Sequence, residues 1–176
     1  MASAQISLPQ SGFAGDINNP VQGFPVSIVA LDDGHGHTGL VACQFAVSFP
    51  KGVFNFPIGG ELASSYIQLG DLPENNGASG SWTVTANSPQ DGVLNINLSL
   101  IAGQSPITDT AGGSLLLINF PVFLNPSTPT PETITISFRG PTGFHSQVVG
   151  TTNPPPPYVT AALGLPVTGV ITINPV

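Results

Sequence analysis

The sequence has very few charged side chains, and positively charged ones are almost absent. Lys51 and Arg139 are the only lysine and arginine, against nine acidic residues, so the formal net charge of the 176-residue chain is −7 at pH 7. Without clustered lysine and arginine there is no basic patch to hold the phosphates of a nucleic acid or an anionic membrane surface. We therefore exclude nucleic-acid binding and electrostatic adhesion to membranes.

Cysteine and long hydrophobic runs are also scarce. The single cysteine, Cys43, excludes an internal disulfide bond, and its place in the apolar run Leu40–Phe49 predicts a buried, unreactive thiol. No apolar run approaches the roughly 18 residues of a membrane-spanning helix. Met1–Ser3 lacks the basic and apolar regions of a signal peptide, so we expect an exported protein to be represented here by a mature form or an excised module.

Residues that strongly favour helices are scarce as well, because Lys, Arg, Glu and Met together number six. What the chain has instead is Thr, Val, Ile, Ser and Asn, together with 21 Gly and 19 Pro. The first group favours strands, and Gly and Pro favour turns. Hydrophobic residues make up 40% of the sequence, which is enough to bury a core. The composition therefore predicts an all-β protein, and the length predicts a single domain over residues 1–176.

Apolar and polar side chains alternate along much of the chain, which is typical of strands with one buried face. The clearest case is Val93–Ile101, where every second residue is Leu or Ile and the residues between are Asn or Ser. Turn residues such as Asp91-Gly92 separate the segments. The nine predicted strands are Ala4–Leu8, Gly23–Leu31, Leu40–Phe49, Leu62–Leu69, Ser81–Asn87, Val93–Ile101, Ser114–Leu124, Thr133–Phe138 and Thr168–Ile173. This pattern predicts a nine-stranded jelly-roll β-sandwich of two packed sheets.

Two proline features bear on this prediction. Pro121 lacks the N–H of an interior strand residue, so the strand Ser114–Leu124 is expected at a sheet edge or with a bulge. The stretch 140–166 has little alternation and contains Pro154–Pro157, which favour an extended spacer. We expect a long surface loop there. A partner-contact loop, or a strand around Phe144–Val149, stays open as an alternative.

The order of segments resembles the cohesin family. A Gly-Leu-x-x-x-x-Phe-x-Val-x-Phe strand followed by a Pro-x-x-Val turn is similar to Gly39–Val53. Later cohesin segments look like Asp91–Ile96 and Gly113–Phe120, and the closing strand looks like Thr168–Ile173. The resemblance covers the chain from about Ala4 to Ile173 and implies a jelly roll that acts as an extracellular receptor for dockerin modules.

The resemblance also implies where a partner binds. In cohesins, the sheet of the third, fifth, sixth and eighth strands presents the binding face. The outward positions that match it here are Gln44, Ala46, Ser48, Asn95, Asn97, Ser99, Thr133, Thr135 and Ser137. Such a small, uncharged face suits hydrogen-bonded protein recognition with little electrostatic steering. No intrinsic cofactor is expected, and calcium, where required, is expected on the dockerin partner.

Few residues in the sequence indicate chemistry. Asp32, Asp33, His35 and His37 are weak metal-ligand candidates, but their spacing matches no zinc or calcium motif and favours an ordinary hairpin loop. The chain has three histidines and no Gly-x-Ser-x-Gly nucleophile motif, so no catalytic residues and no enzyme are predicted.

Two further functions stay open. A carbohydrate-binding module needs exposed, coplanar aromatic rings, for which Trp82, Tyr66 and Tyr158 are the candidates. A self-assembling subunit of a cell-surface layer or fibre would associate through strand edges at Ala4–Leu8 and Val170–Val176. Both would place the chain outside the cell or at its surface, as the cohesin resemblance also does.

Overall fold

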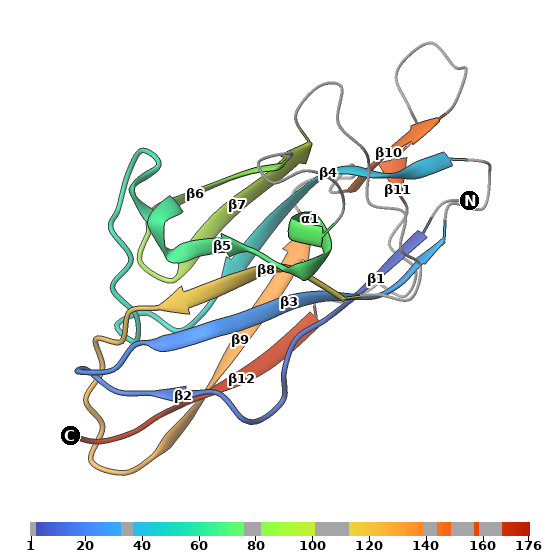
Figure 1. Cartoon of the computed structure of the whole chain (residues 1–176). Coiled ribbons are helices and arrows are strands. Elements are labelled where there is room, and N and C mark those ends of the chain that lie inside the picture. The colour runs from blue at the N-terminus through green and yellow to red at the C-terminus, as the bar shows by residue number, and fades with distance from the viewer. Residues whose placement is uncertain are drawn as a thin grey trace.

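The computed structural model describes residues 3–32, 37–75, 82–100, 113–138, 144–148, 157–158 and 167–176. Within these ranges the chain forms two β-sheets packed face to face (Figure 1). The first sheet has the order β1-β3-β8-β5, with β1 at Ser3–Ser7, β3 at Val21–Asp32, β8 at Gly113–Phe120 and β5 at Ile67–Leu69. All of its strand pairs are antiparallel. The predicted all-β sandwich is confirmed.

The second sheet is built around β4. On one side, β4 (His37–Ser48) pairs with β7 (Val93–Leu100), which pairs in turn with β6 (Trp82–Gln90). On the other side, its C-terminal half pairs with β9 (Thr130–Phe138), followed by β12 (Val167–Ile173) and β2 (Ala14–Gly15). The N-terminal half of β4 pairs with β10 (Phe144–Val148), which carries β11 (Pro157–Tyr158).

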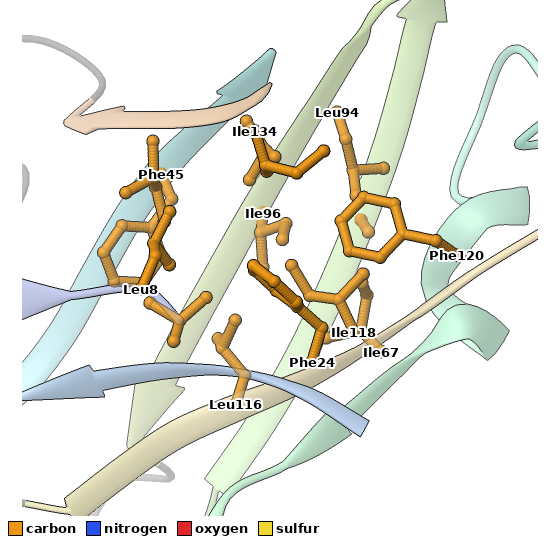
Figure 2. Close-up of a cluster of buried hydrophobic side chains, with 14 of the residues drawn as sticks. Leu8, Phe24, Phe45, Ile67, Leu94, Ile96, Leu116, Ile118, Phe120 and Ile134 are labelled. Atoms are coloured by element: carbon orange, nitrogen blue, oxygen red, sulfur yellow. The ribbon is translucent and has the colours of Figure 1, made fainter. Parts of the chain in front are cut away.

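The core lies between the two sheets and consists of the apolar half of each alternating segment. Figure 2 shows side chains of β3 and β8 directed toward those of β4, β7 and β9. Leu94, Ile96 and Leu98 of β7 are at most 1% exposed, as the alternation in Val93–Ile101 predicts. Cys43 is fully buried, and burial raises the pKa of its thiol far above the ordinary value. The predicted burial of Cys43 is therefore confirmed.

Phe120 is the centre of an aromatic cluster at one end of this core. Its ring lies 4.7 Å from that of Phe54, 5.5 Å from Phe24 and 5.6 Å from Phe56, measured between ring centroids. The contact with Phe24 is nearly perpendicular, which suits the quadrupoles of aromatic rings. Phe120 thus joins strand β3 to the loop that follows β4.

The predicted strand Leu62–Leu69 is wrong over its first part. Leu62–Tyr66 forms a short 3₁₀ helix, η1, and only Ile67–Leu69 is a strand. The helix turns Ala63 into the core and places Ser64 beside the edge of β6. There the Ser64 hydroxyl accepts a hydrogen bond from the Ala86 N–H at 2.8 Å and donates one to the Ala86 carbonyl at 3.3 Å. Both backbone groups of Ala86 at the edge are therefore satisfied by one side chain.

The prediction for the strand that precedes Pro121 is corrected in part: its pairing with β3 shifts in register between Val26 and Ser27, but it does not lie at a sheet edge. The strand that was expected to reach Leu124 ends at Phe120, and β8 lies inside its sheet between β3 and β5. Pro121 therefore follows the strand, where its missing N–H has no effect on the sheet, and its carbonyl accepts a hydrogen bond from the Asn55 N–H at 2.9 Å.

Two short elements, α1 and β10, differ from the nine predicted strands. Helix α1, at Asp71–Asn75, was not expected from the sequence. Asp71 is tied to the start of β8, since its carboxylate accepts hydrogen bonds from the N–H and the hydroxyl of Ser114, both at 2.6 Å. In the stretch 140–166, where a loop was expected, β10 occupies the position of the strand that was left open as an alternative.

Candidate protein-interaction face

The nine residues implied as a binding face lie together on one surface of the second sheet. Strand register places Gln44 opposite Asn97, and Ala46 between Asn95 on β7 and Ser137 on β9. They point away from the core because Cys43, Phe45 and Val47, the alternate residues of β4, are buried. The alternation thus brings all nine positions, which lie far apart in the sequence, onto the solvent side of β4, β7 and β9.

This surface continues onto the two flanking strands, which the sequence analysis did not include. Thr83, Thr85 and Asn87 of β6 lie opposite the outward residues of β7, and Thr168 and Val170 of β12 lie opposite those of β9. The period-two pattern in the predicted strands at 81–87 and 168–173 was the signal that could have found them. We define the outer face as Ala42, Gln44, Ala46, Ser48, Thr83, Thr85, Asn87, Val93, Asn95, Asn97, Ser99, Thr133, Thr135, Ser137, Thr168, Val170 and Thr172.

The polar side chains at the centre of the outer face are accessible to a partner. Asn95 and Asn97 are half-buried between their neighbours, whereas Gln44 and Ser48 are exposed. Within the described ranges, the side-chain amides of Gln44, Asn95 and Asn97 make no hydrogen bond. At the margin, the hydroxyls of Thr83 and Ser99 lie 3.1 Å apart and share one. The central amides are thus free to bond to a partner.

No side chain of the outer face is charged. Among the described charged residues, Lys51 and Asp91 lie in turns, and Glu132 lies on the side of β9 opposite to the outer face, where partial burial raises the pKa of its carboxyl. In the turn after β2, a side-chain hydrogen bond from Asn19 lowers the pKa of Asp16. The outer face is therefore a neutral, hydrogen-bonding surface with acidic groups only beyond its borders.

The segment that carries the four weak metal-ligand candidates is described only at its two ends. Asp32 ends β3 and His37 begins β4, while Asp33 and His35 lie outside the described residues. Among the residues that the structure describes, no group of three or more His, Cys, Asp or Glu is placed to hold a metal ion. No helix in the described ranges is long and apolar enough to cross a membrane.

The aromatic platform of a carbohydrate-binding module is not formed by Trp82. Its side chain is 4% exposed and packs in the core, so its ring is not presented to a sugar. Tyr66 is half-buried, and its ring packs edge-on against Phe56 with the centroids 5.5 Å apart. The side chain of Tyr158 lies outside the described residues.

One of the two strand edges considered for self-assembly is covered. Residues that follow β1 run beside β12, where Val170 donates a backbone hydrogen bond to Pro9 at 2.9 Å and Thr172 donates one to Phe13 at 3.0 Å. The end of the chain is held as well, because the Val176 N–H donates to the Asn125 side chain at 3.0 Å. The expectation that Val170–Val176 could add to another copy as a strand is wrong, since that edge is already paired within the chain.

Several solved structures are similar to this chain over nearly its whole length. The sixth cohesin of scaffoldin B from Acetivibrio cellulolyticus, in complex with a Cel5 dockerin mutant, is 14% identical with a TM-score of 0.57, covering 98% of this chain and 99% of that one. The third ScaC cohesin from Acetivibrio cellulolyticus, in complex with a ScaB dockerin, is 15% identical with a TM-score of 0.56, covering 97% and 99%.

A cohesin from a second organism gives a similar result. The seventh ScaB type I cohesin from Pseudobacteroides cellulosolvens is 14% identical with a TM-score of 0.58, covering 99% of this chain and 94% of that one. No protein-family model and no curated protein sequence matches the chain. At such low identity, agreement over nearly the full length of several cohesins establishes the architecture: the chain has the cohesin fold.

Proposed function

We propose that this protein is a non-catalytic interaction module that binds a dockerin-type partner through the outer face. The observation that carries the proposal is the neutral outer face with its unbonded amides at Gln44, Asn95 and Asn97, on a fold whose solved examples include cohesins in complex with dockerins. Residues held in paired strands lose little conformational freedom when a partner docks on them.

The outer face also suits binding rather than catalysis. It presents hydroxyl and amide groups, which donate and accept hydrogen bonds, but no group that titrates near neutral pH and no nucleophile with an adjacent base. The resemblance to cohesins further implies that the module itself needs no cofactor and that any calcium is bound by the dockerin partner. The proposed setting is extracellular or at the cell surface, where cohesin-type scaffolds assemble.

The test is to place a bulky charge in the centre of the outer face. In the Asn97→Arg and Ser48→Arg variants, a buried guanidinium without a partner group is expected to weaken binding by at least about a hundredfold. Binding is measured calorimetrically against a panel of dockerin modules from the source organism. Thermal unfolding should stay close to that of the unchanged protein, because both side chains point away from the core.

Gln68→Arg is the matched control, because Gln68 is exposed on β5 of the other sheet. It should leave both affinity and thermal stability unchanged. Equal affinity of the Asn97→Arg, Ser48→Arg and unchanged proteins would show that the outer face is not the binding site. Failure of every dockerin to bind, with concentration-dependent light scattering from the protein alone, would replace the proposal by self-assembly.

A further inference from the structure

A pocket separate from the outer face opens at one end of the sandwich. Its volume is about 230 Å³, and it lies between the loop that follows β4, the β6–β7 turn and the β8–β9 connection. Figure 1 places the first and last of these segments at the same end of the molecule as the C terminus. Three phenylalanines, Phe49, Phe54 and Phe56, line the pocket together with Phe123 and Ile58.

The backbone around the pocket is fixed by hydrogen bonds between segments distant in sequence. The Phe123 N–H donates to the Val53 carbonyl at 2.8 Å, which joins the β8–β9 connection to the loop after β4. The Gly59 N–H donates to the Ser88 carbonyl at 3.0 Å, which joins that same loop to the end of β6. Both walls are thus attached to the sheets, so the pocket is present before a ligand arrives.

The pocket has a buried apolar interior and an exposed apolar entrance. Phe49, Phe54 and Phe56 are at most 8% exposed and belong to the core. Phe123 and Ile58 are 64% and 58% exposed, although both are large hydrophobic residues. Exposed apolar groups beside a concave apolar site are typical of an interaction site, because covering them removes that surface from water.

Two polar side chains stand at the entrance with unused hydrogen-bonding capacity. Asn55 is exposed, and its amide makes no hydrogen bond within the described ranges. One oxygen of the Asp91 carboxylate, Oδ2, accepts a hydrogen bond from the Gly52 N–H at 2.9 Å, while Oδ1 has no such bond there. An amide and a carboxylate beside an apolar pocket match the N–H and C=O groups of a peptide segment that carries an apolar side chain.

The size of the pocket sets the size of that side chain. A dry protein cavity of about 150 Å³ holds a benzene molecule, whereas pockets for drug-sized ligands begin at about 300 Å³. The 230 Å³ observed here therefore fits one aromatic ring or one branched aliphatic group. We propose that the pocket binds a single Phe-like or Leu-like side chain presented by a segment of a protein partner.

The pocket lies next to the outer face, so one partner can reach both. Asn87 of the outer face donates a side-chain hydrogen bond to the carbonyl of Gly60, in the loop that also carries Ile58. Gly60 therefore connects the border of the outer face to the pocket wall. The assignment of the side chain to the same partner rests on the proposed function, whereas binding of the side chain itself does not.

The first experiment tests the pocket without any partner. N-acetyl-phenylalanine amide and N-acetyl-leucine amide are titrated into the protein, and binding is followed by ¹H–¹³C NMR at the rings of Phe54 and Phe56, which line the pocket and are present in every variant. Saturable shifts of both rings are expected, and the Ile58→Ser/Phe123→Ser double variant should bind at least about tenfold more weakly. Absence of saturable shifts, or equal binding of N-acetyl-asparagine amide, would overturn the proposal.

Leu62→Ser is the matched control, because Leu62 is 61% exposed and does not line the pocket. It should leave the titration unchanged, and all three substitutions should leave the thermal unfolding temperature nearly unchanged, since the side chains are solvent-exposed. An effect of Leu62→Ser equal to that of the double variant would contradict a specific site.

The second experiment uses a dockerin that binds the unchanged protein. The Ile58→Ser/Phe123→Ser variant is expected to raise its dissociation constant about tenfold or more, and Leu62→Ser should not. Unchanged affinity of the double variant would overturn the assignment of the pocket to this partner. Failure of all dockerins to bind, with the amino-acid amides still bound, would instead contradict the proposed function and leave the pocket assignment standing.

Discussion

The outer face and the pocket end of the same sandwich differ in shape, chemistry and origin. The outer face is neutral and largely polar, and its residues come from five paired strands. The pocket end is concave and apolar, and its residues come from loops and turns. The described charges and the most exposed hydrophobic residues, such as Phe123, lie outside the outer face. A sheet surface thus provides uniform chemistry, whereas a loop-built end combines different groups in a small space.

The largest effect is expected from a substitution in the core beneath the pocket. Phe120 is fully buried, and its ring contacts those of Phe49, Phe54 and Phe56, which line the pocket. Phe120→Ala should lower the free energy of unfolding by about 3–5 kcal/mol through lost burial and a new cavity. Urea denaturation at pH 7 measures this loss.

The same variant separates the two regions. Because the aromatic cluster forms the interior of the pocket, binding of N-acetyl-phenylalanine amide should weaken more than binding of a dockerin to the outer face. The matched control for stability alone is Phe123→Ala. Because Phe123 is exposed, this substitution should change the free energy of unfolding by less than about 0.5 kcal/mol. Equal weakening of both ligands by Phe120→Ala would show that the two regions are not independent.

A smaller effect is expected at the opposite end of β8, where Asp71 bonds to Ser114. These hydrogen bonds hold the pKa of Asp71 below its ordinary value, and the one from the Ser114 hydroxyl has the largest effect. The carboxylate therefore stabilises the folded state only while it is ionised. Asp71→Asn should cost up to about 1 kcal/mol at neutral pH, because solvent screens this exposed group.

The stabilisation by the Asp71 carboxylate is expected to depend on pH. The stabilisation is fully present above the unfolded-state pKa of about 3.9 and is lost as the pH falls through the lower pKa of the folded state. The difference in stability between the unchanged protein and Asp71→Asn should therefore be constant from about pH 5 to pH 7 and vanish in stronger acid. A difference that grows on acidification, measured by urea denaturation, would contradict this assignment.

The smallest expected effect is that of salt on the outer face. Because the outer face carries no charge, the dissociation constant of a dockerin should change less than about threefold between about 50 and about 500 mM NaCl. Thr168→Lys, which adds a charge at the border of the outer face, provides the contrast and should introduce a salt dependence. A steep dependence in the unchanged protein would mean that charged groups beyond the outer face take part in binding.

The sequence was most informative where burial repeats every second residue. Alternation in Val93–Ile101 was sufficient to predict which side chains of β7 enter the core, and it assigned Asn95 and Asn97 to the opposite side. The resemblance to cohesins then gathered residues of three strands into one candidate face. Their role in binding stays a prediction, but their common surface follows from strand register.

The pocket, η1 and α1 were not predictable by the same reasoning. Phe49, Ile58 and Phe123 come together only because loops distant in sequence bond to each other, and such contacts leave no periodic pattern. In Leu62–Leu69 the residues Ser64 and Ser65 looked compatible with a strand, but burial of Ala63 and the bonds of Ser64 to β6 favour a helical turn. Tertiary contacts decided both cases.

The side chain of Ser64 has a consequence for how copies of the protein behave when crowded together. A sheet grows when an incoming strand finds open N–H and C=O groups on the last strand. At Ala86 the N–H and the C=O are both already bonded to the Ser64 hydroxyl. This side chain offers no backbone hydrogen-bonding groups with which a further strand could pair. At this position the sheet is therefore closed to edge-on addition, and neighbouring copies can approach one another there without forming a fibre.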